Sequence, residues 1–460
     1  MITSASCGDL NHGAHHGAHH AGHHPGHHPG HHPAHSADDS TGGPGGHHQG
    51  QAHNAAQRRL QGRLPELDYG LLVAAIAITA FGFIMVASAS LPVADSSHGS
   101  PFHFVIRHAL ALVLALGAGL LCFAVPVRGW ERAGLLLFLV GLVILVLVLV
   151  PGVGRTANGA TRWIPLGPLN LQGSEFMKFF AVVYVAGYLV RRQAEVASSV
   201  LGFVRPMILM AVASALILAE PDFGTTAVML ATIMGLLFLG GVPAINFAVL
   251  TGLVAVALVA LIIYEPYRLE RLLNFLHPFD DPYDKGFQLS QALIAFGRGE
   301  WLGVGLGHGI QKQFFLPEAH TDFLMAVVGE EFGFVGVLLV ILGFAFLVWR
   351  AFDIGARAQR QGDLFAAYLA HGLGLGLGLQ AFINIGVNVG LLPTKGLTMP
   401  FMSYGSNSLI AAIMAVGVLL RIDRTLRLAA RDAGLAVGHG PAPGATAWAS
   451  PPGGTPWARA

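Results

Sequence analysis

The sequence has little charge and almost no cysteine, and both shortages narrow the class of protein. Charged side chains make up 11% of the 460 residues, whereas hydrophobic ones make up 53%. A soluble domain usually carries about 25% charged residues, so this chain has too few to cover a surface exposed to water. The two cysteines, Cys7 and Cys122, exclude a disulfide framework and a cysteine-ligated metal site. With a formal net charge of +1 and no basic block, the sequence also gives no sign of a nucleic-acid partner.

The first 63 residues lack the apolar side chains that a folded core requires. They consist mostly of His, Gly, Ala and Pro and hold 15 of the 23 histidines, between His12 and His53. Paired imidazoles at this density bind Ni²⁺, Zn²⁺ or Cu²⁺ adventitiously, but such tracts are also typical of dispensable disordered tails. We therefore expect a disordered tail at 1–63, a membrane domain at 64–427 and a second disordered tail at 428–460.

Long apolar runs begin at Tyr69, and each is close to the ~20 residues that one helix needs to cross a bilayer. They predict an all-α polytopic membrane protein with about ten transmembrane helices. The predicted spans are 69–91, 103–125, 131–151, 174–190, 205–220, 223–241, 244–264, 323–349, 365–390 and 400–421.

Arginine residues gather in alternate connections, and this asymmetry predicts the orientation, because short basic loops stay in the cytoplasm. Both termini are then cytoplasmic. Three connections face outward: 152–173, the long 265–322 before the eighth helix, and 391–399. The candidate functional residues lie in or beside these three connections.

Two outward connections keep cations on the side where basic residues are disfavoured. The first holds Arg162 next to Trp163, and the third holds Lys395, followed by Ser403 where the last span begins. A cation outside the membrane suggests an anionic ligand. However, Trp163 is equally typical of an interfacial anchor, and Lys395 of a lysine that extends from a helix end to the interface.

The longest outward connection ends with three ionisable residues, Glu318, His320 and Asp322, directly before the eighth predicted helix. A loop of this length is usually functional, and its Phe287–Phe296 segment is predicted to form an amphipathic helix. Asp322 is placed either to cap the next helix or to hydrogen-bond a substrate hydroxyl as a base. The residues alone leave both roles open.

Several spaced motifs together resemble those of the SEDS family, named for shape, elongation, division and sporulation. They are NGATRW at 158–163, PDFGT at 221–225, FGRGE at 296–300, QK at 311–312, PEAHTDF at 317–323, GEEFG at 329–333, PTKG at 393–396 and SYG at 403–405. PEAHTDF and PTKG are more similar to the cell-division branch than to the elongation branch. The likeness covers Tyr69 to about Arg427, and the sequence departs from the family pattern at QGSE (172–175), EPDFGT (220–225) and SYGSNS (403–408).

This resemblance implies a peptidoglycan glycosyltransferase of the bacterial cytoplasmic (inner) membrane that polymerises lipid II at the division septum. It implies inverting transfer with release of undecaprenyl pyrophosphate, and partnership with a class B penicillin-binding protein and other divisome proteins. By resemblance, the catalytic residue is Asp322, and the expected substrate-binding residues are Arg162, Trp163, Glu318, His320, Lys395 and Ser403. The sequence identifies no definite cofactor. Arg162, Lys395 or a divalent cation, Mg²⁺ or Mn²⁺, would offset the diphosphate charge.

Two other functions are kept as alternatives. Acidic residues within predicted spans also suit a transporter that flips lipid II, and a multi-span protein also serves as a non-catalytic scaffold of the divisome. The polar motifs gather at the outward surface rather than at the bilayer midplane, and this favours polymerisation over transport.

Overall fold

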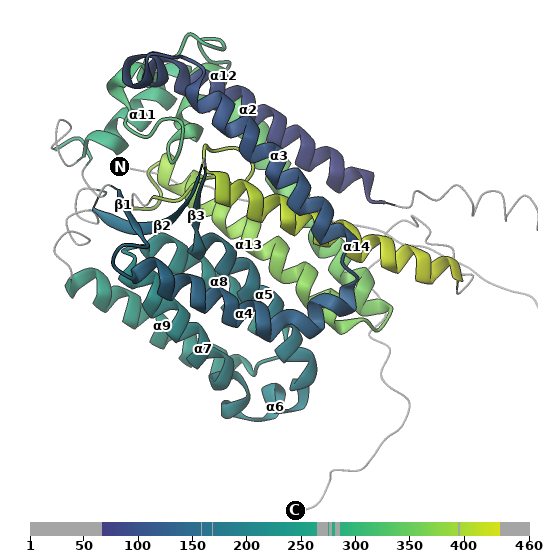
Figure 1. Ribbon diagram of the computed structural model, residues 1–460. Coiled ribbons are helices and arrows are strands. Elements are labelled where there is room, and N and C mark those ends of the chain that lie inside the picture. Colours follow the sequence, from purple (N-terminus) through teal and green to yellow (C-terminus); the bar gives the residue numbers. More distant parts are fainter. Residues whose placement is uncertain are drawn as a thin grey trace, which may run out of the picture. The chain divides into compact units, whose positions relative to one another are not determined.

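The computed structural model describes residues 67–157, 159–167, 169–264, 275, 278–280, 286–393 and 396–432, and long helices make up most of them (Figure 1). The predicted N-terminal tail with His12–His53, residue Lys395 and residues 433–460 lie outside the described residues.

Ten helices of 17 residues or more occur within the described ranges, and each corresponds to one predicted span. They are α2 (Tyr69–His98), α3 (His103–Ala124), α4 (Val127–Leu149), α5 (Gly173–Arg191), α7 (Val200–Ala219), α8 (Phe223–Leu239), α9 (Ala244–Tyr264), α12 (Leu324–Arg360), α13 (Leu364–Asn388) and α14 (Ser406–Asp432). Shorter helical elements are α6 (Gln193–Ser198), α11 (Phe287–Gly299) and the π-helical turn η1 (Gln311–Phe315). The α11 helix confirms the predicted helix in the long connection.

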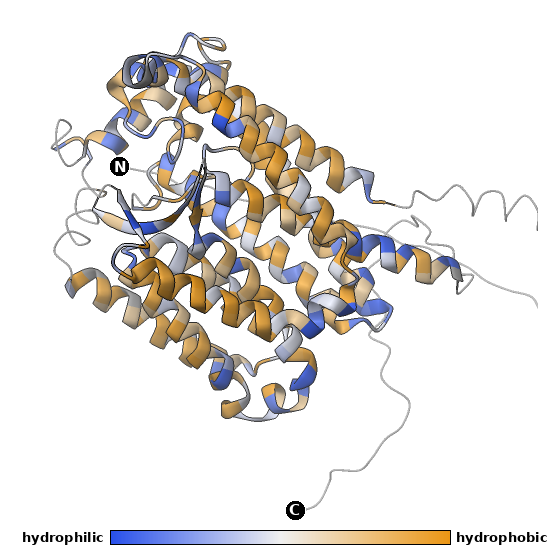
Figure 2. Cartoon of the chain, viewed as in Figure 1, coloured by the Kyte–Doolittle hydropathy of each residue, from blue (hydrophilic) through white to orange (hydrophobic). Residues whose placement is uncertain are grey.

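Eight of the described helices are long and apolar enough to cross a membrane. The α8 helix is apolar but has only 17 residues, and α14 combines an apolar first half with a charged second half. Figure 2 shows hydrophobic residues along the length of the helices and hydrophilic residues mainly near helix ends and in connections. The chain is thus a multi-pass membrane protein, and ten crossings with both termini in the cytoplasm remain a prediction.

The last helix differs in position from the predicted span 400–421. It begins at Ser406, because Phe401 has a φ of 63° and the chain turns before the helix. It continues to Asp432, and Asp423 and Arg427, one turn apart, form an ion pair of 2.7 Å within the extension. The first five residues of the predicted C-terminal tail, 428–432, are therefore helical.

The first connection that is predicted to face outward, 152–173, contains a small sheet, so the all-α prediction is wrong there. Strands β1 (Arg155–Ala157), β2 (Ala160–Leu166) and β3 (Leu169–Gln172) form an antiparallel sheet in the order β1-β2-β3. Trp163 lies opposite both Arg155 and Gln172 in the register. The two turns contain Gly159 and Gly167 with φ of 75° and 68°, a conformation that glycine adopts readily.

The helices α3 and α14 approach each other through small residues. Ala111, Ala115 and Gly119 of α3 are buried, and a β-carbon on Gly417 would lie 2.3 Å from the carbonyl oxygen of Gly119. Small residues allow the close backbone contact on which helix association in a membrane depends. This contact fixes α14, whose first residues follow the SYG motif.

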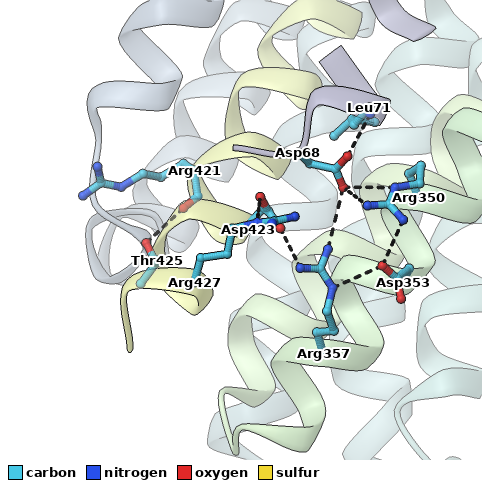
Figure 3. Close-up of polar contacts among 9 residues, drawn as sticks. All are labelled: Asp68, Leu71, Arg350, Asp353, Arg357, Arg421, Asp423, Thr425 and Arg427. Carbon is cyan, nitrogen blue, oxygen red and sulfur yellow. Dashed lines mark hydrogen bonds and ion pairs between the residues drawn. The ribbon is translucent and has the colours of Figure 1, made fainter. Parts of the chain in front are cut away.

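The start of α2, the end of α12 and the second half of α14 meet in a network of ion pairs, which we call the arginine network (Figure 3). Arg350 Nε donates to Asp68 at 3.0 Å, and Arg357 binds Asp353 at 3.1 Å and Asp423 at 2.7 Å. Asp68 also caps α2 by accepting from the Leu71 N–H at 3.0 Å. Asp68 and Asp423 are buried, so these charges depend on their partners. The network collects residues that the arginine pattern predicts to be cytoplasmic.

Candidate functional site

Asp322 lies directly before α12 but does not cap it. The helix begins at Leu324 after its N-cap residue Phe323, and the N–H of Ala326 in its first turn donates to Asn388 Oδ1 at 3.1 Å rather than to Asp322. The capping explanation that the sequence left open is therefore removed for Asp322. Its backbone carbonyl accepts from Asn384 Nδ2 at 3.0 Å and from Asn388 Nδ2 at 2.9 Å, both on α13. The residue is half-buried.

The Asp322 carboxylate lies beside the PTKG segment. A β-carbon on Gly396 would lie 3.2 Å from Asp322 Oδ2, and Asn384, which binds the Asp322 carbonyl, also donates to the carbonyl of Leu397. The structure thus brings together two motifs that are far apart in the sequence. Lys395 precedes Gly396 in the chain but is outside the described residues.

Glu318 and His320 form the turn that leads to Asp322. Glu318 has a φ of 54°, and its carbonyl accepts from the N–H of Thr321 at 3.1 Å and of Phe323 at 3.2 Å. The His320 ring packs 4.9 Å from Phe104, measured between ring centroids. Burial lowers the pKa of His320, although Glu318 opposes this, so the imidazole is neutral at neutral pH.

The SYG segment packs against the same turn. The N–H of Tyr404 donates to the His320 carbonyl at 2.9 Å, and the two rings lie 5.5 Å apart. Burial raises the pKa of the Tyr404 hydroxyl, with a hydrogen bond from Arg107 opposing it. Ser403, which stays a predicted substrate-binding residue, accepts from the Met399 N–H at 3.0 Å and is buried. In this structure Ser403 holds the backbone of the loop.

Arg162, predicted to bind substrate, fastens the sheet to the turn between α7 and α8. Its Nε donates to the Glu220 carbonyl at 2.9 Å, and its Nη2 donates to the Pro221 carbonyl. Trp163, the next residue of β2, is half-buried. The sheet is also tied to α14, because Asn407 Nδ2 donates to the Asn170 carbonyl at 2.8 Å.

The turn between α7 and α8 holds two acids with opposite environments. Asp222 caps α8 by accepting from the Thr225 N–H at 3.1 Å, and also accepts from Ser174 Oγ at 3.1 Å. Glu220 is fully buried, and its carboxylate oxygens have no hydrogen-bond partner among the residues that the structure describes. The pKa of Glu220 is raised to about 8, because burial and the neighbouring Asp222 raise it more than Arg162 lowers it.

Three other acids within the predicted spans are paired. Glu175 binds Lys178 at 3.0 Å, Glu330 binds Arg298 at 2.8 Å, and Glu331 binds Lys312 and Ser88. The FGRGE, QK and GEEFG motifs therefore form a cluster around the buried Glu330 and Glu331, with Arg298 at its more exposed edge. No group of three or more His, Cys, Asp or Glu side chains able to hold a metal ion is found within the described ranges.

Polar residues on α13 are part of the site and were missed from the sequence. Gln380 Nε2 donates to the Thr398 carbonyl at 2.9 Å, and its Oε1 accepts from Lys178 Nζ at 2.7 Å. With Asn384 and Asn388 it forms a series of amides spaced four residues apart in an apolar helix. This four-residue spacing of amides in an apolar helix could have indicated the site from the sequence, because polar residues inside the membrane are rare and costly.

Comparison with known proteins places this geometry in a family. The family model for FtsW, RodA and SpoVE, described as "Cell cycle protein", matches residues 69–428. A relative from Allochromatium vinosum, named "Probable peptidoglycan glycosyltransferase FtsW", is 61% identical over 361 residues, covering 78% of this chain and 90% of its own length. One from Thioalkalivibrio sulfidiphilus with the same name is 50% identical over 375 residues, covering 81% and 94%.

Solved structures agree with this result. One, described as "Structural coordination of polymerization and crosslinking by a peptidoglycan synthase complex", matches with a TM-score of 0.64 and 30% identity, covering 78% of this chain and 98% of that one. The rod shape determining protein RodA of Thermus thermophilus matches with a TM-score of 0.57 and 29% identity, covering 78% and 97%. The chain therefore belongs to the FtsW/RodA/SpoVE family of cell cycle proteins, the SEDS family that its motifs resemble.

Proposed function

We propose that this protein is the septal peptidoglycan glycosyltransferase, which polymerises lipid II into glycan strands. The names of its relatives support the reaction class. The observation that carries the proposal is the Asp322 carboxylate: it does not cap α12, and it lies beside Gly396 of the PTKG segment. An acid without a capping role, at the point where two motif segments meet, suits a reacting group.

The proposed reaction is an inverting transfer. The 4-hydroxyl oxygen of the acceptor sugar forms a bond to the anomeric carbon of the growing donor strand, as Asp322 takes the hydroxyl proton. The bond from that carbon to the diphosphate breaks, and undecaprenyl pyrophosphate leaves with the electron pair. An inverting transfer uses one base and needs no carboxylate nucleophile, so the single acid Asp322 is sufficient.

The leaving diphosphate requires positive charge rather than an acid. Lys395 precedes Gly396, the residue beside Asp322, and is the proposed cation. Arg162 Nε and Nη2 donate to carbonyls of the α7–α8 turn, so we assign Arg162 to holding the sheet against this turn. Its remaining N–H groups are proposed to bind the ligand. Neutral His320, exposed Glu318 and Trp163 are proposed to contact the sugars.

The proposed partner is a class B penicillin-binding protein that crosslinks the new glycan, with other divisome proteins at the septum of the inner membrane. One structural neighbour is described as a peptidoglycan synthase complex that coordinates polymerisation and crosslinking, and this supports the pairing. The arginine network supports the proposed orientation, because it gathers the residues predicted to be cytoplasmic at the far end of α12 from Asp322.

The alternative is a lipid II flippase. Glu175, Glu330 and Glu331 do not support transport, because ion pairs with Lys178, Arg298 and Lys312 neutralise their charges.

Polymerisation of labelled lipid II tests the proposed function. The purified protein with its transpeptidase partner should convert labelled lipid II into long glycan strands, which are detected on a gel. Transbilayer movement of labelled lipid II in vesicles, with no polymer formed, would favour the flippase instead.

A further inference from the structure

One face of α13 carries three amide side chains, Gln380, Asn384 and Asn388, which we call the amide stripe. They are four residues apart, so they lie one above the other along the helix. All three are buried, and a buried amide in apolar surroundings is costly unless it is hydrogen-bonded. The acceptors of its amide N–H groups include backbone carbonyls of two different loops.

The hydrogen bonds of the stripe converge on the candidate site. Asn384 and Asn388 both donate to the Asp322 carbonyl, at 3.0 Å and 2.9 Å. Asn384 also donates to the Leu397 carbonyl, and Gln380 donates to the Thr398 carbonyl at 2.9 Å. The stripe thus binds the residue before α12 and the segment after PTKG at the same time.

These bonds determine where the Asp322 carboxylate lies. Two donors on one carbonyl oxygen hold the peptide plane between Asp322 and Phe323, and so restrain the Cα atom from which the Asp322 side chain extends. Asn388 Oδ1 accepts from the Ala326 N–H at 3.1 Å, so the same amide also holds the first turn of α12. Because Asn384 binds both loops, the separation between Asp322 and the 396–398 segment is set by one rigid helix.

We propose that Asn384 and Asn388 are positioning residues for Asp322, which hold its carboxylate at a fixed distance from the 396–398 segment. The proposal rests on the glycosyl transfer proposed above. Both amides act through the backbone and do not touch the sugars. A displacement of a reacting group by about 1 Å lowers a rate about 10²-fold, so losing these bonds should reduce kcat and leave KM unchanged.

The test replaces the amides without changing the shape of the core. Asn384→Leu and Asn388→Leu remove the donors at similar size, and Asn384→Asp keeps the side-chain outline but removes the N–H groups. Thr232→Val is the matched control, because Thr232 is buried, packs against Gly376 of α13 and donates to Val228 of its own helix at 2.7 Å. Initial rates of labelled lipid II polymerisation with the transpeptidase partner, measured over a range of lipid II concentrations, give kcat and KM.

The expected result is a kcat roughly 10- to 100-fold lower in the three amide variants, an unchanged KM, and wild-type rates for Thr232→Val. Wild-type kcat in Asn384→Leu and Asn388→Leu, while Asp322→Asn is inactive, would overturn the positioning role alone. Normal polymer from Asp322→Asn would overturn the proposed function instead. Loss of monodisperse protein in all three amide variants, or an equal loss of kcat in Thr232→Val, would show a merely structural stripe and also overturn the inference.

Discussion

Among single residues, Glu220 has a charge that depends on pH near neutrality. Burial raises the pKa of its carboxyl from 4.5 to about 8, helped by Asp222 and opposed by Arg162. The folded state therefore holds the proton more tightly than the unfolded state. The stability that this proton contributes is complete below pH 4.5 and is lost as the pH rises to about 8.

Glu220→Gln keeps the size of the protonated side chain and removes its titration. We expect the thermal midpoint of the wild type in detergent to fall between about pH 5 and 8, with unfolding free energy lost at no more than about 1.4 kcal/mol per pH unit. In Glu220→Gln most of this fall should disappear. Glu195→Gln is the control, because Glu195 is an exposed acid paired with Arg192 and Arg205. Identical pH profiles for the wild type and Glu220→Gln would contradict the assignment.

The hydrogen-bond partners of individual polar side chains were the part of the site that the sequence predicted least well. Asp322 was identified by its place before a helix and by its motif, and the structure removes its capping role. Arg162 and Ser403 stay predicted ligand contacts, and the structure adds that they bind backbone groups of the α7–α8 turn and of Met399. Such choices depend on which loop the fold brings within about 3 Å, and a sequence pattern does not contain that information.

At the scale of elements, α12 is interrupted where two motifs meet. Gly333 has φ of 64° and ψ of −162°, outside the helical region. The N–H groups of Phe334 and Val335 consequently donate to Glu300 and Trp301, at 2.9 Å and 3.1 Å. At the break, the carbonyls of Glu300 and Trp301 therefore replace two acceptors of the helix, and the Arg298–Glu330 ion pair of 2.8 Å lies nearby.

Gly333→Ala should disrupt this junction. A β-carbon on Gly333 would lie 2.5 Å from the backbone nitrogen of Gly303, and the conformation alone costs a side chain roughly 1–3 kcal/mol. We expect a lower thermal midpoint and less monodisperse protein. Gly343→Ala in the same helix is the control, because its β-carbon would lie an ordinary 3.4 Å from Ile78. A Gly333→Ala protein as stable as Gly343→Ala would show that the break is not required.

Helices were predicted far better than other elements. An apolar run long enough to cross a bilayer has few possible structures other than a helix. All ten predicted runs correspond to helices in the described residues. Strands β1 to β3 are short and lie in a Gly- and Pro-rich connection, where alternation over a few residues does not distinguish a strand from a loop. The start of α14 was placed six residues early, because apolar Pro400, Phe401 and Met402 extend the hydropathy signal into a turn.

For the whole molecule, the structure supports a sidedness that the arginine pattern predicts. Arg357 near the end of α12 contacts both Asp68 before α2 and Asp423 in α14, so these three helix ends face the same side. The Asp322 turn leads into the opposite end of α12, and the sheet is bound to the opposite end of α14 through Asn407. The rule that basic loops stay inside assigns the arginine network to the cytoplasm.

Reporter fusions test this orientation. A reporter fused after Arg360 should be active as a cytoplasmic marker, and one inserted at Asp280 should be active as an extracytoplasmic marker. The reverse pattern at these two positions would place Asp322 on the cytoplasmic side, where the proposed polymerisation does not occur.

Asp322→Asn tests the central claim most directly, because it removes the charge and the proton acceptor at almost constant size. The Asp322 side chain does not cap α12, so the variant should fold, insert and bind its transpeptidase partner normally. Asp280→Asn, an exposed acid in the same connection, serves as the matched control. We predict that Asp280→Asn polymerises labelled lipid II at the wild-type rate, and that Asp322→Asn is slower by the ~10²–10⁴-fold typical of a lost general base. Near-normal glycan polymer from Asp322→Asn would contradict the catalytic assignment and favour the flippase or scaffold function.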